Sequence, residues 1–375
     1  MFKKQIFLLL FIVVTAIVNA QSTNTNLQFL HTIQLPVTSV KNQDTTGTCW
    51  CFGGTSLLES QYLKSSGVSL DLSEMFIIRN IYIDKAKNYI LRQGHAQFGE
   101  GGLGHDVINA IAAYGDEPLS VYNGLKPGEK VYNHAAMVIT LKNYLDSILK
   151  TPPIPGDWLV KYTQLLDDNL GTPPVTFQYN GTAYTPKTFS TEIMKFNADD
   201  YVNITSLADR PYYEPFILQV PDNFSNGYYY NLPLDEMILL AKTAIKNGYS
   251  FLWDTDASNN GFLQDKGLAL LLNDAKKYNE DSINEDMKEE EWNENKRLQL
   301  YENLTTQDDH LMHVFGIEQS KGGKTFFLVK NSWGNIGPCK GDINASEAYF
   351  AINTVSLVIP KAAFSKELLA KLKIK

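Results

Sequence analysis

The sequence predicts an α+β protein, because helical patterns dominate the first part of the chain and strand patterns dominate the last part. Apolar residues recur near helical spacing after Cys49, and Gly67 is expected to end that helix. Residues 311–317 and 325–330 have the length and apolarity of strands, with a hairpin signal at 321–324 between them. With 375 residues, 44% of them hydrophobic, the chain can bury a large core.

Further elements follow from their boundary residues. Ser73 is the expected N-cap of a second helix, and glycines are expected to end two more helices, over 106–114 and 234–246. Gly53 and Gly54 lower helix stability, so their presence inside the first helix indicates close packing of another part of the chain. The last elements expected are strands over 348–352 and 356–359 and a basic helix over 365–373.

The first twenty residues have the pattern of a secretory signal peptide. Lys3 and Lys4 precede an apolar run over 6–18, and small residues end the segment at Ala20. The run is shorter than the roughly 20 apolar residues that a membrane-spanning helix needs. We therefore expect an exported protein, periplasmic or extracellular, without stable membrane insertion after cleavage. Residues 21–36 leave no room for a folded pro-segment before the first motif.

Composition excludes several classes of function and of site. The chain has 33 basic and 41 acidic residues, a net charge of −8, and no dense basic stripe, so nucleic acid is not an expected partner. Its histidines and cysteines lack metal-ligand spacing, and no metal or cofactor is expected. The three cysteines allow at most one disulfide. A Cys51–Cys339 bridge would leave Cys49 free, but nothing in the sequence favours it over two reduced thiols.

Residues 42–52 form a polar loop that leads directly into an apolar helix, and they place Cys49 at its first turn. The positive end of a helix dipole favours the thiolate form of cysteine, which is the nucleophilic form. Gln43, six residues earlier, carries an amide that can help to bind the oxyanion formed when a thiolate attacks a carbonyl. The alternative is a buried structural cysteine in a core helix.

A thiol nucleophile needs a base, and that base needs an orienting group. His310 lies at the start of a predicted strand, and the hairpin partner of that strand ends in Asn331-Ser332-Trp333-Gly334. Asn331 is therefore expected to hold one imidazole nitrogen while the other faces the thiol, and Trp333 is expected to shield the pair from water. His313 is the alternative base. Residues three apart on a strand face opposite sides, so only one of the two histidines can meet Cys49.

In this order, Gln43, Gly47-Thr48-Cys49-Trp50, His310 and Asn331-Ser332-Trp333-Gly334 resemble the papain-type cysteine peptidases. The resemblance implies a two-lobed fold with a helical left lobe and a β-barrel-like right lobe. It also implies hydrolysis of peptide or protein substrates by a Cys49–His310–Asn331 triad with Gln43 at the oxyanion. Gly101 and Gly102 resemble the glycine pair that binds the substrate backbone as an added strand. Trp50, Trp333 and Asp309 are counted with them as substrate-binding residues.

The number of residues between Cys49 and His310 indicates which branch of the family the chain resembles. Residue numbers 49 and 310 differ by 261, against roughly 130 to 150 positions in ordinary papain-like enzymes. We therefore expect a left lobe with an N-terminal strand over 21–125, a mixed and mainly helical insertion over 126–300, and a β-rich right lobe with a C-terminal helix over 301–375. Local matches, such as 185–189 and 207–211, make the chain most similar to the bleomycin hydrolase and aminopeptidase C branch.

Two departures from the family pattern bear on function. Papain-like enzymes usually have a disulfide cysteine three residues before the nucleophile. This chain has Thr46 there, and members of the branch likewise lack the cysteine. Members of the branch also carry a C-terminal arm that lies in the cleft and restricts them to trimming from the amino end, whereas this chain stops at Lys375 soon after its last expected helix. An aminopeptidase-like activity is expected, with an endopeptidase, a thiol acyl hydrolase or transferase, and an inactive binding homologue as alternatives. The ring assembly of the family makes an oligomer possible, but the acidic composition does not support it.

Overall fold

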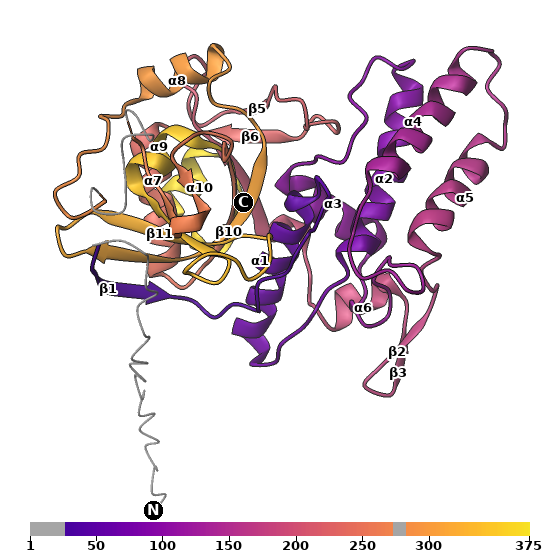
Figure 1. Ribbon diagram of the computed structural model, residues 1–375, viewed down its shortest axis with the longest axis horizontal. Helices are drawn as coiled ribbons and strands as arrows, with labels where there is room; N and C mark the ends of the chain where they lie inside the picture. The colour runs from indigo at the N-terminus through magenta and orange to yellow at the C-terminus, as the bar shows by residue number, and fades with distance from the viewer. Residues whose placement is uncertain (1–26, 273–282) are drawn as a thin grey trace, which may run out of the picture.

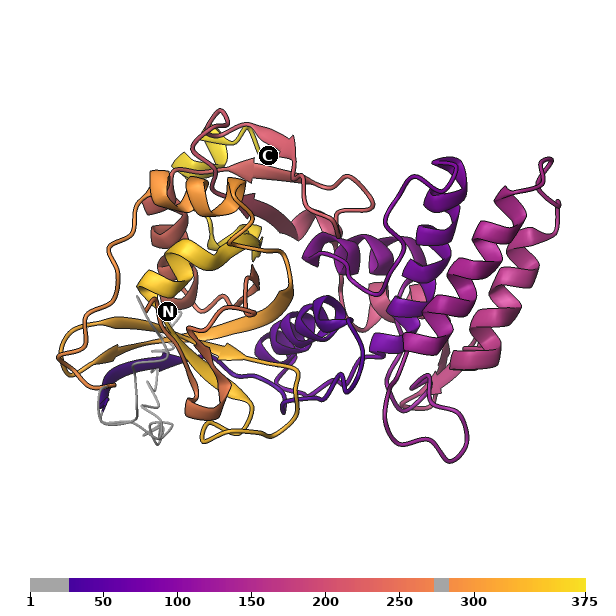
Figure 2. The same ribbon diagram turned by 45° about the horizontal axis from the view of Figure 1, so that its top comes forward.

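The computed structural model describes residues 27–272 and 283–375, which form a helical lobe beside a sheet lobe (Figures 1 and 2). This arrangement confirms the predicted α+β class. The signal peptide predicted for residues 1–20 lies outside the described residues. Among the residues that are described, no helix is both long and apolar enough to cross a membrane.

The sheet lobe is built on β10 (His310–Ser320), which pairs antiparallel with β1 (Phe29–Gln34), β7 (Phe251–Thr255) and β11 (Thr325–Lys330). The full order is β5-β6-β4-β13-β7-β10-β11-β12-β9-β8, so within the described residues the strands form an open sheet and not a closed barrel. The remaining strands of the sheet are β4 (Tyr201–Thr205), β5 (Pro215–Ile217), β6 (Tyr228–Asn231), β8 (Phe262–Leu263), β9 (Leu268–Ala269), β12 (Asp342–Ser346) and β13 (Thr354–Pro360).

The helical lobe contains the helices of the first half of the chain, and the residues predicted to bound them do so. Ser73 accepts a hydrogen bond from the Phe76 backbone at the start of α2, and Gly67 ends α1 with a left-handed φ of 73°. Both observations confirm the expected caps. The helices are α1 (Cys49–Ser66), α2 (Glu74–Leu91), α3 (Gly104–Tyr114), α4 (Ala135–Leu149), α5 (Trp158–Leu170) and α6 (Pro186–Glu192).

Residues 126–300 contribute to both lobes. Helices α4 to α6 and the hairpin of β2 (Phe177–Tyr179) and β3 (Thr182–Tyr184) lie with the helical lobe, whereas β4 to β9 belong to the large sheet. The domain boundaries themselves stay a prediction. The sheet lobe also carries α7 (Leu234–Lys246), α8 (Glu294–Glu302), α9 (Glu347–Asn353) and α10 (Lys366–Lys371).

The predicted strand over 348–352 is wrong, because these residues form helix α9. Ser346 caps this helix by accepting a hydrogen bond from the Tyr349 backbone, and Glu347 supplies a negative charge in its first turn. The run is so short and so uniformly apolar that its periodicity does not separate a strand from a buried helix. Tyr349, Phe350 and Ala351 are all fully buried, as a core helix requires.

Helix α1 is in close contact with both lobes at its glycines. A Cβ on Gly53 would lie 2.8 Å from Leu252 Cδ1 and 3.3 Å from the Leu311 carbonyl oxygen. A Cβ on Gly54 would lie 2.6 Å from Val107 in α3. The close packing predicted from the two glycines is therefore confirmed. It fixes the first turns of α1 against β7, β10 and α3.

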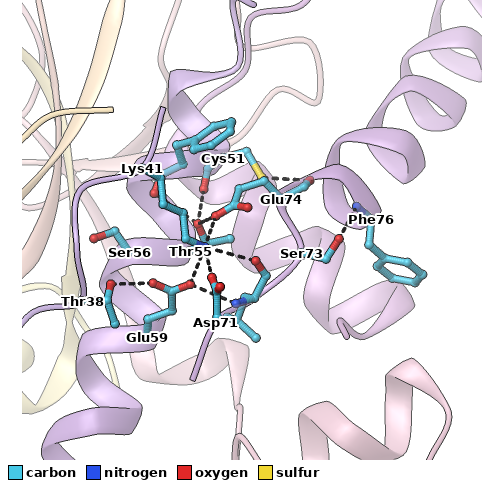
Figure 3. Close-up of polar contacts among 12 residues, drawn as sticks. Thr38, Lys41, Cys51, Thr55, Ser56, Glu59, Asp71, Ser73, Glu74 and Phe76 are labelled. Atoms are coloured by element: carbon cyan, nitrogen blue, oxygen red, sulfur yellow. Dashed lines mark hydrogen bonds and ion pairs between the residues drawn. The ribbon is translucent and has the colours of Figure 1, made fainter. Parts of the chain in front are cut away.

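A buried ionic cluster anchors the loop that precedes α1 (Figure 3). Lys41 Nζ lies 2.8 Å from Glu59 Oε1, 2.6 Å from Glu74 Oε1 and 2.6 Å from Asp71 Oδ1. Burial alone would lower the pKa of Lys41, but the three carboxylates outweigh this effect and raise the pKa well above its usual value. The cluster therefore holds a charged lysine two residues before Gln43.

Replacing Lys41 with methionine should destabilise the protein by about 3 kcal/mol, because buried Glu59 and Glu74 would lose their counter-charge. Urea denaturation followed by tryptophan fluorescence measures this change. The control is Lys161→Met, which breaks the exposed pair with Asp157 and should leave the denaturation midpoint nearly unchanged. Equal midpoints for wild type and Lys41→Met would contradict a structural role for the cluster.

Candidate active site

Cys49 is the first residue of α1 and is 7% exposed. Its thiol lies beside the His310–Leu311 segment, since the Leu311 backbone forms a hydrogen bond with it. Burial raises the pKa of Cys49 to about 12; the Leu311 hydrogen bond acts in the opposite direction, whereas the charges of Asp254, Asp222 and Asp308 add to the increase. This direction is opposite to the one expected from the helix dipole. Burial thus favours the neutral thiol form of Cys49.

His310 lies at the start of β10 and bonds to the residue that follows β11. The distance from His310 Nε2 to Asn331 Oδ1 is 2.7 Å. An amide oxygen only accepts, so Nε2 carries the proton and Nδ1 is the free basic nitrogen of the neutral ring. Burial lowers the pKa of His310 to about 4, although the bond to Asn331 acts against this decrease. Trp333 covers the ring, with its centroid 4.7 Å from that of the imidazole.

Gln264 fixes the orientation of Asn331, and sequence reasoning missed it. Its Oε1 accepts a hydrogen bond of 2.8 Å from Asn331 Nδ2, which leaves Asn331 Oδ1 for the histidine. Gln264 lies in a short 3-10 helix between β8 and β9, far from Asn331 in the chain. No local pattern marks it, because the contact depends on the pairing of β9 with β12.

His313, the alternative base, faces a different part of α1. Its Nδ1 lies 2.9 Å from Ser56 Oγ, two helical turns beyond Cys49, and the side chain is fully buried. Burial lowers the pKa of His313 well below its usual value. The structure thus brings His310, and not His313, together with Asn331 and Trp333.

Gln43 is held on both sides of its amide. Ser332 Oγ donates to Gln43 Oε1 over 2.5 Å, and Gln43 Nε2 donates to the Thr46 carbonyl over 2.6 Å. The backbones are also joined, since the Gln43 N–H donates to the Ser332 carbonyl over 2.8 Å. Sequence reasoning missed the role of Ser332, for which adjacency to Asn331 was the available signal. One N–H of the Gln43 amide remains for another acceptor.

The glycine pair lies on Trp50. A Cβ on Gly102 would lie 3.0 Å from the indole ring, and Trp50 Nε1 donates to the Glu100 carbonyl over 2.9 Å. Buried Lys85 donates to the carbonyl oxygens of Gly99 and Gly101. Trp50 is 1% exposed, so its ring packs against the glycine backbone from the interior of the protein.

Asp309 and the remaining cysteines have structural contacts. The carboxylate of Asp309 accepts hydrogen bonds from the backbones of Ala257 and Ser258, at 2.8 and 3.1 Å, and so fixes the loop after β7.

All three cysteines are free and buried. The alternative of a Cys51–Cys339 disulfide is therefore wrong; Cys51 instead donates to the Glu74 carbonyl in the core of the helical lobe.

Comparisons with known proteins identify the family. A family model described as "Papain family cysteine protease" matches residues 29–84, and one described as "Peptidase C1-like family" matches residues 162–375, more than half of the chain. The chain belongs to the peptidase C1-like family. It is a papain-like cysteine peptidase of the bleomycin hydrolase and aminopeptidase C branch.

Relatives of this peptidase cover most of its length. Aminopeptidase C of Streptococcus thermophilus is 24% identical over 91% of the chain and 84% of its own length. Bleomycin hydrolase of Gallus gallus is 20% identical over the same shares. The crystal structure of PepW from Lactobacillus rhamnosis HN001 matches with a TM-score of 0.73 and 21% identity, over 93% of this chain and 85% of that one. This last likeness supports the fold.

Replacing Ser332 with alanine in this peptidase should lower kcat about tenfold with little change in KM, because the Gln43 amide loses one of its two fixed contacts. Steady-state kinetics on a peptide substrate measures both constants. Ser332→Thr keeps the hydroxyl and should restore most of the rate. Ser147→Ala, which removes an exposed hydroxyl on α4, is the matched control. An unchanged kcat for Ser332→Ala would contradict a positioning role for Ser332.

Proposed function

We propose that the peptidase hydrolyses peptide bonds with Cys49 as nucleophile, His310 as base and Asn331 as the group that orients the base. The observation that carries this proposal is the bond from His310 Nε2 to Asn331 Oδ1, which leaves Nδ1 as the basic nitrogen next to the segment that contacts the Cys49 thiol. Three parts of the chain supply these groups: His310 bonds to Asn331 and packs on Trp333, and Gln43 bonds to Ser332 of the same segment.

The chemistry begins from a neutral thiol and a neutral imidazole. As the sulfur attacks the substrate carbonyl carbon, His310 Nδ1 takes the thiol proton, and the resulting imidazolium keeps its Nε2 bond to Asn331. The oxyanion accepts hydrogen bonds from the Cys49 backbone N–H, which has no intrahelical acceptor at this position, and from the Gln43 amide. His310 then gives its proton to the leaving amine. His310 then deprotonates a water that attacks the thioester carbonyl; the C–S bond breaks, the acid leaves, and the Cys49 sulfur takes the proton back from His310.

Burial contributes to this mechanism by excluding water from the thiol and the imidazole. Desolvation disfavours an ion pair in the resting state, as the raised pKa of Cys49 and the lowered pKa of His310 indicate. The oxyanion donors and the imidazolium stabilise charges that develop only during attack. Proton transfer is thus coupled to the attack on the substrate.

We also propose export of the mature protein, on the basis of the signal-peptide pattern in residues 1–20.

Replacing His310 with alanine should lower kcat/KM by about a thousandfold, because the thiol loses the base that takes its proton during attack. His313→Ala removes a similarly buried imidazole and should retain a substantial part of the activity, while Cys49→Ala gives the background rate. Turnover of an unblocked peptide measures all three variants, and thermal melting verifies that each one folds. A reversed order of the two histidine variants would reassign the base, and turnover by Cys49→Ala would disprove the proposed mechanism.

A further inference from the structure

A cavity of about 720 Å³ lies at the other end of α1 from Cys49. Helix α1 lies between the two lobes (Figures 1 and 2) and contributes residues from Leu58 to Ser65 to the cavity. Residue numbers 49 and 61 differ by 12, which at 1.5 Å per residue is about 18 Å along the helix axis. The other walls come from within residues 35–36, 194–201, 248–250 and 360–369. The cavity is therefore separate from the candidate active site.

The walls of the cavity are largely apolar. Phe196 and Tyr201 stack on each other, with their ring centroids 5.9 Å apart and their planes 21° from parallel. Leu35, Leu58 and Leu369 add aliphatic surface. Cavities of roughly 300 to 1,000 Å³ with mainly apolar walls are typical of small-molecule sites. The size and the mixed aromatic and aliphatic surface suit an extended alkyl chain.

Lysines make this cavity positive, although the protein as a whole is acidic. Lys64, Lys195 and Lys361 line it, whereas Asp200 is the one acid among its lining residues. The net charge of the whole chain is −8. Among the described residues, none of the three lysines forms an ion pair with an aspartate or glutamate side chain. The charge of the cavity therefore favours an anion.

The contacts of the lysines leave donors for such an anion. Lys64 Nζ donates to the Gly248 carbonyl over 2.5 Å and lies 3.8 Å from the centroid of the Tyr249 ring. Lys361 Nζ donates to the backbone oxygen of Lys375 over 3.3 Å. An ammonium group has three donors, so both lysines keep donors for a further acceptor. Lys195 makes no hydrogen bond or ion pair within the described part of the chain.

The α1 wall also contains polar atoms without a partner. Tyr201 donates to Gln61 Oε1 over 2.6 Å, but Gln61 Nε2 is buried without an acceptor among the described residues. Ser60 is 3% exposed, and its Oγ likewise has no partner there. A buried polar group without a hydrogen bond costs free energy. A ligand oxygen that comes within reach of either atom would recover part of this cost.

These features together specify the chemistry of the ligand. A carboxylate accepts charge-assisted hydrogen bonds from ammonium groups, which are stronger than bonds between neutral groups. A cationic head would be repelled by the lysines, and a neutral one would gain only the weaker bonds. Burial of an alkyl chain against the apolar walls supplies a favourable free energy that grows with each methylene.

We propose that this cavity binds a long-chain carboxylate. The alkyl chain lies against the apolar walls that include Phe196 and Tyr201, and the carboxylate is bound by Lys64 and Lys195. The inference goes beyond the proposed function and does not depend on it, because no residue of the candidate active site lines the cavity.

Isothermal titration calorimetry with decanoate on the mature protein tests the inference. The wild type should bind decanoate with a Kd on the order of 10 µM. Decanol and decyltrimethylammonium carry the same chain with a neutral or a cationic head. Both should bind at least about tenfold more weakly than decanoate.

Two lysine variants test the charge of the cavity. Lys64→Met and Lys195→Met should each weaken decanoate binding about tenfold and leave decanol binding nearly unchanged, because methionine removes the charge and keeps an unbranched apolar side chain. Lys246→Met removes an exposed lysine of α7 that does not line the cavity, and this matched control should bind decanoate as the wild type does. Thermal melting verifies folding, and Lys195→Met decides the result if Lys64→Met alters the fold.

A diazirine-bearing decanoate analogue, mapped by mass spectrometry, locates the bound ligand. Cross-links within residues 58–65 or 194–201, together with an unchanged Kd after modification of Cys49 by a thiol-reactive epoxide, support the inference. It is overturned if decanol or decyltrimethylammonium binds as tightly as decanoate, or if both lysine variants keep the wild-type Kd. Loss of decanoate binding after modification of Cys49 would also overturn it, because the ligand would then occupy the active site.

Discussion

The packing of α1 against β7, β10 and α3 is the contact on which the site depends. Gly53 allows Leu252 and the Leu311 carbonyl to approach the helix, and Gly54 does the same for Val107. A Cβ at either glycine would come within 3 Å of a neighbouring side chain, so the first turns of α1 can lie this close to β7 and α3 only without side chains there. That position sets Cys49 beside the segment that follows His310. Cys49 thus owes its position to Gly53 and Gly54, which lie about one turn further along the same helix and let it pack closely.

The groups around Cys49 are each fixed by a residue from another part of the chain. Gln264 orients Asn331, Ser332 orients Gln43, and Lys85 holds the glycine backbone. The ionic cluster of Lys41 anchors the loop that carries Gln43. A site supported in this way loses little freedom when substrate binds, which favours catalysis by positioning. Burial of the same groups raises the pKa of Cys49 and lowers the pKa of His310, so it favours the neutral form of each.

The parts that could be predicted from the sequence are those encoded locally. Ser73 and Gly67 bound their helices as expected, and the hairpin signal at 321–324 correctly joins β10 to β11. The α9 helix was missed because its buried run is apolar on every side and only seven residues long. His310 and Asn331 could be paired in advance because one hairpin carries both.

The remaining residues could not be predicted, because their contacts join segments distant in the chain. Gln264 reaches Asn331 through the β9–β12 pairing, and Asp222 reaches Gly101 through a loop that crosses between the lobes. Nothing in the local sequence distinguishes Asp254 from other strand residues. Its pairing with Leu311 places it near the Cys49 thiol. Burial also decided the pKa direction of Cys49, because desolvation outweighed the helix dipole that the sequence suggested.

The role of Cys49 as nucleophile is tested most directly by mapping the adduct of a thiol-reactive epoxide on the mature protein. We predict a single modification, on Cys49, formed in step with the loss of peptidase activity. Cys51 and Cys339 are free and buried, as Cys49 is, so they serve as internal controls for a reaction that needs only a buried free thiol. An adduct on either of them, or full activity after complete modification of Cys49, would contradict the assignment of Cys49 as the nucleophile.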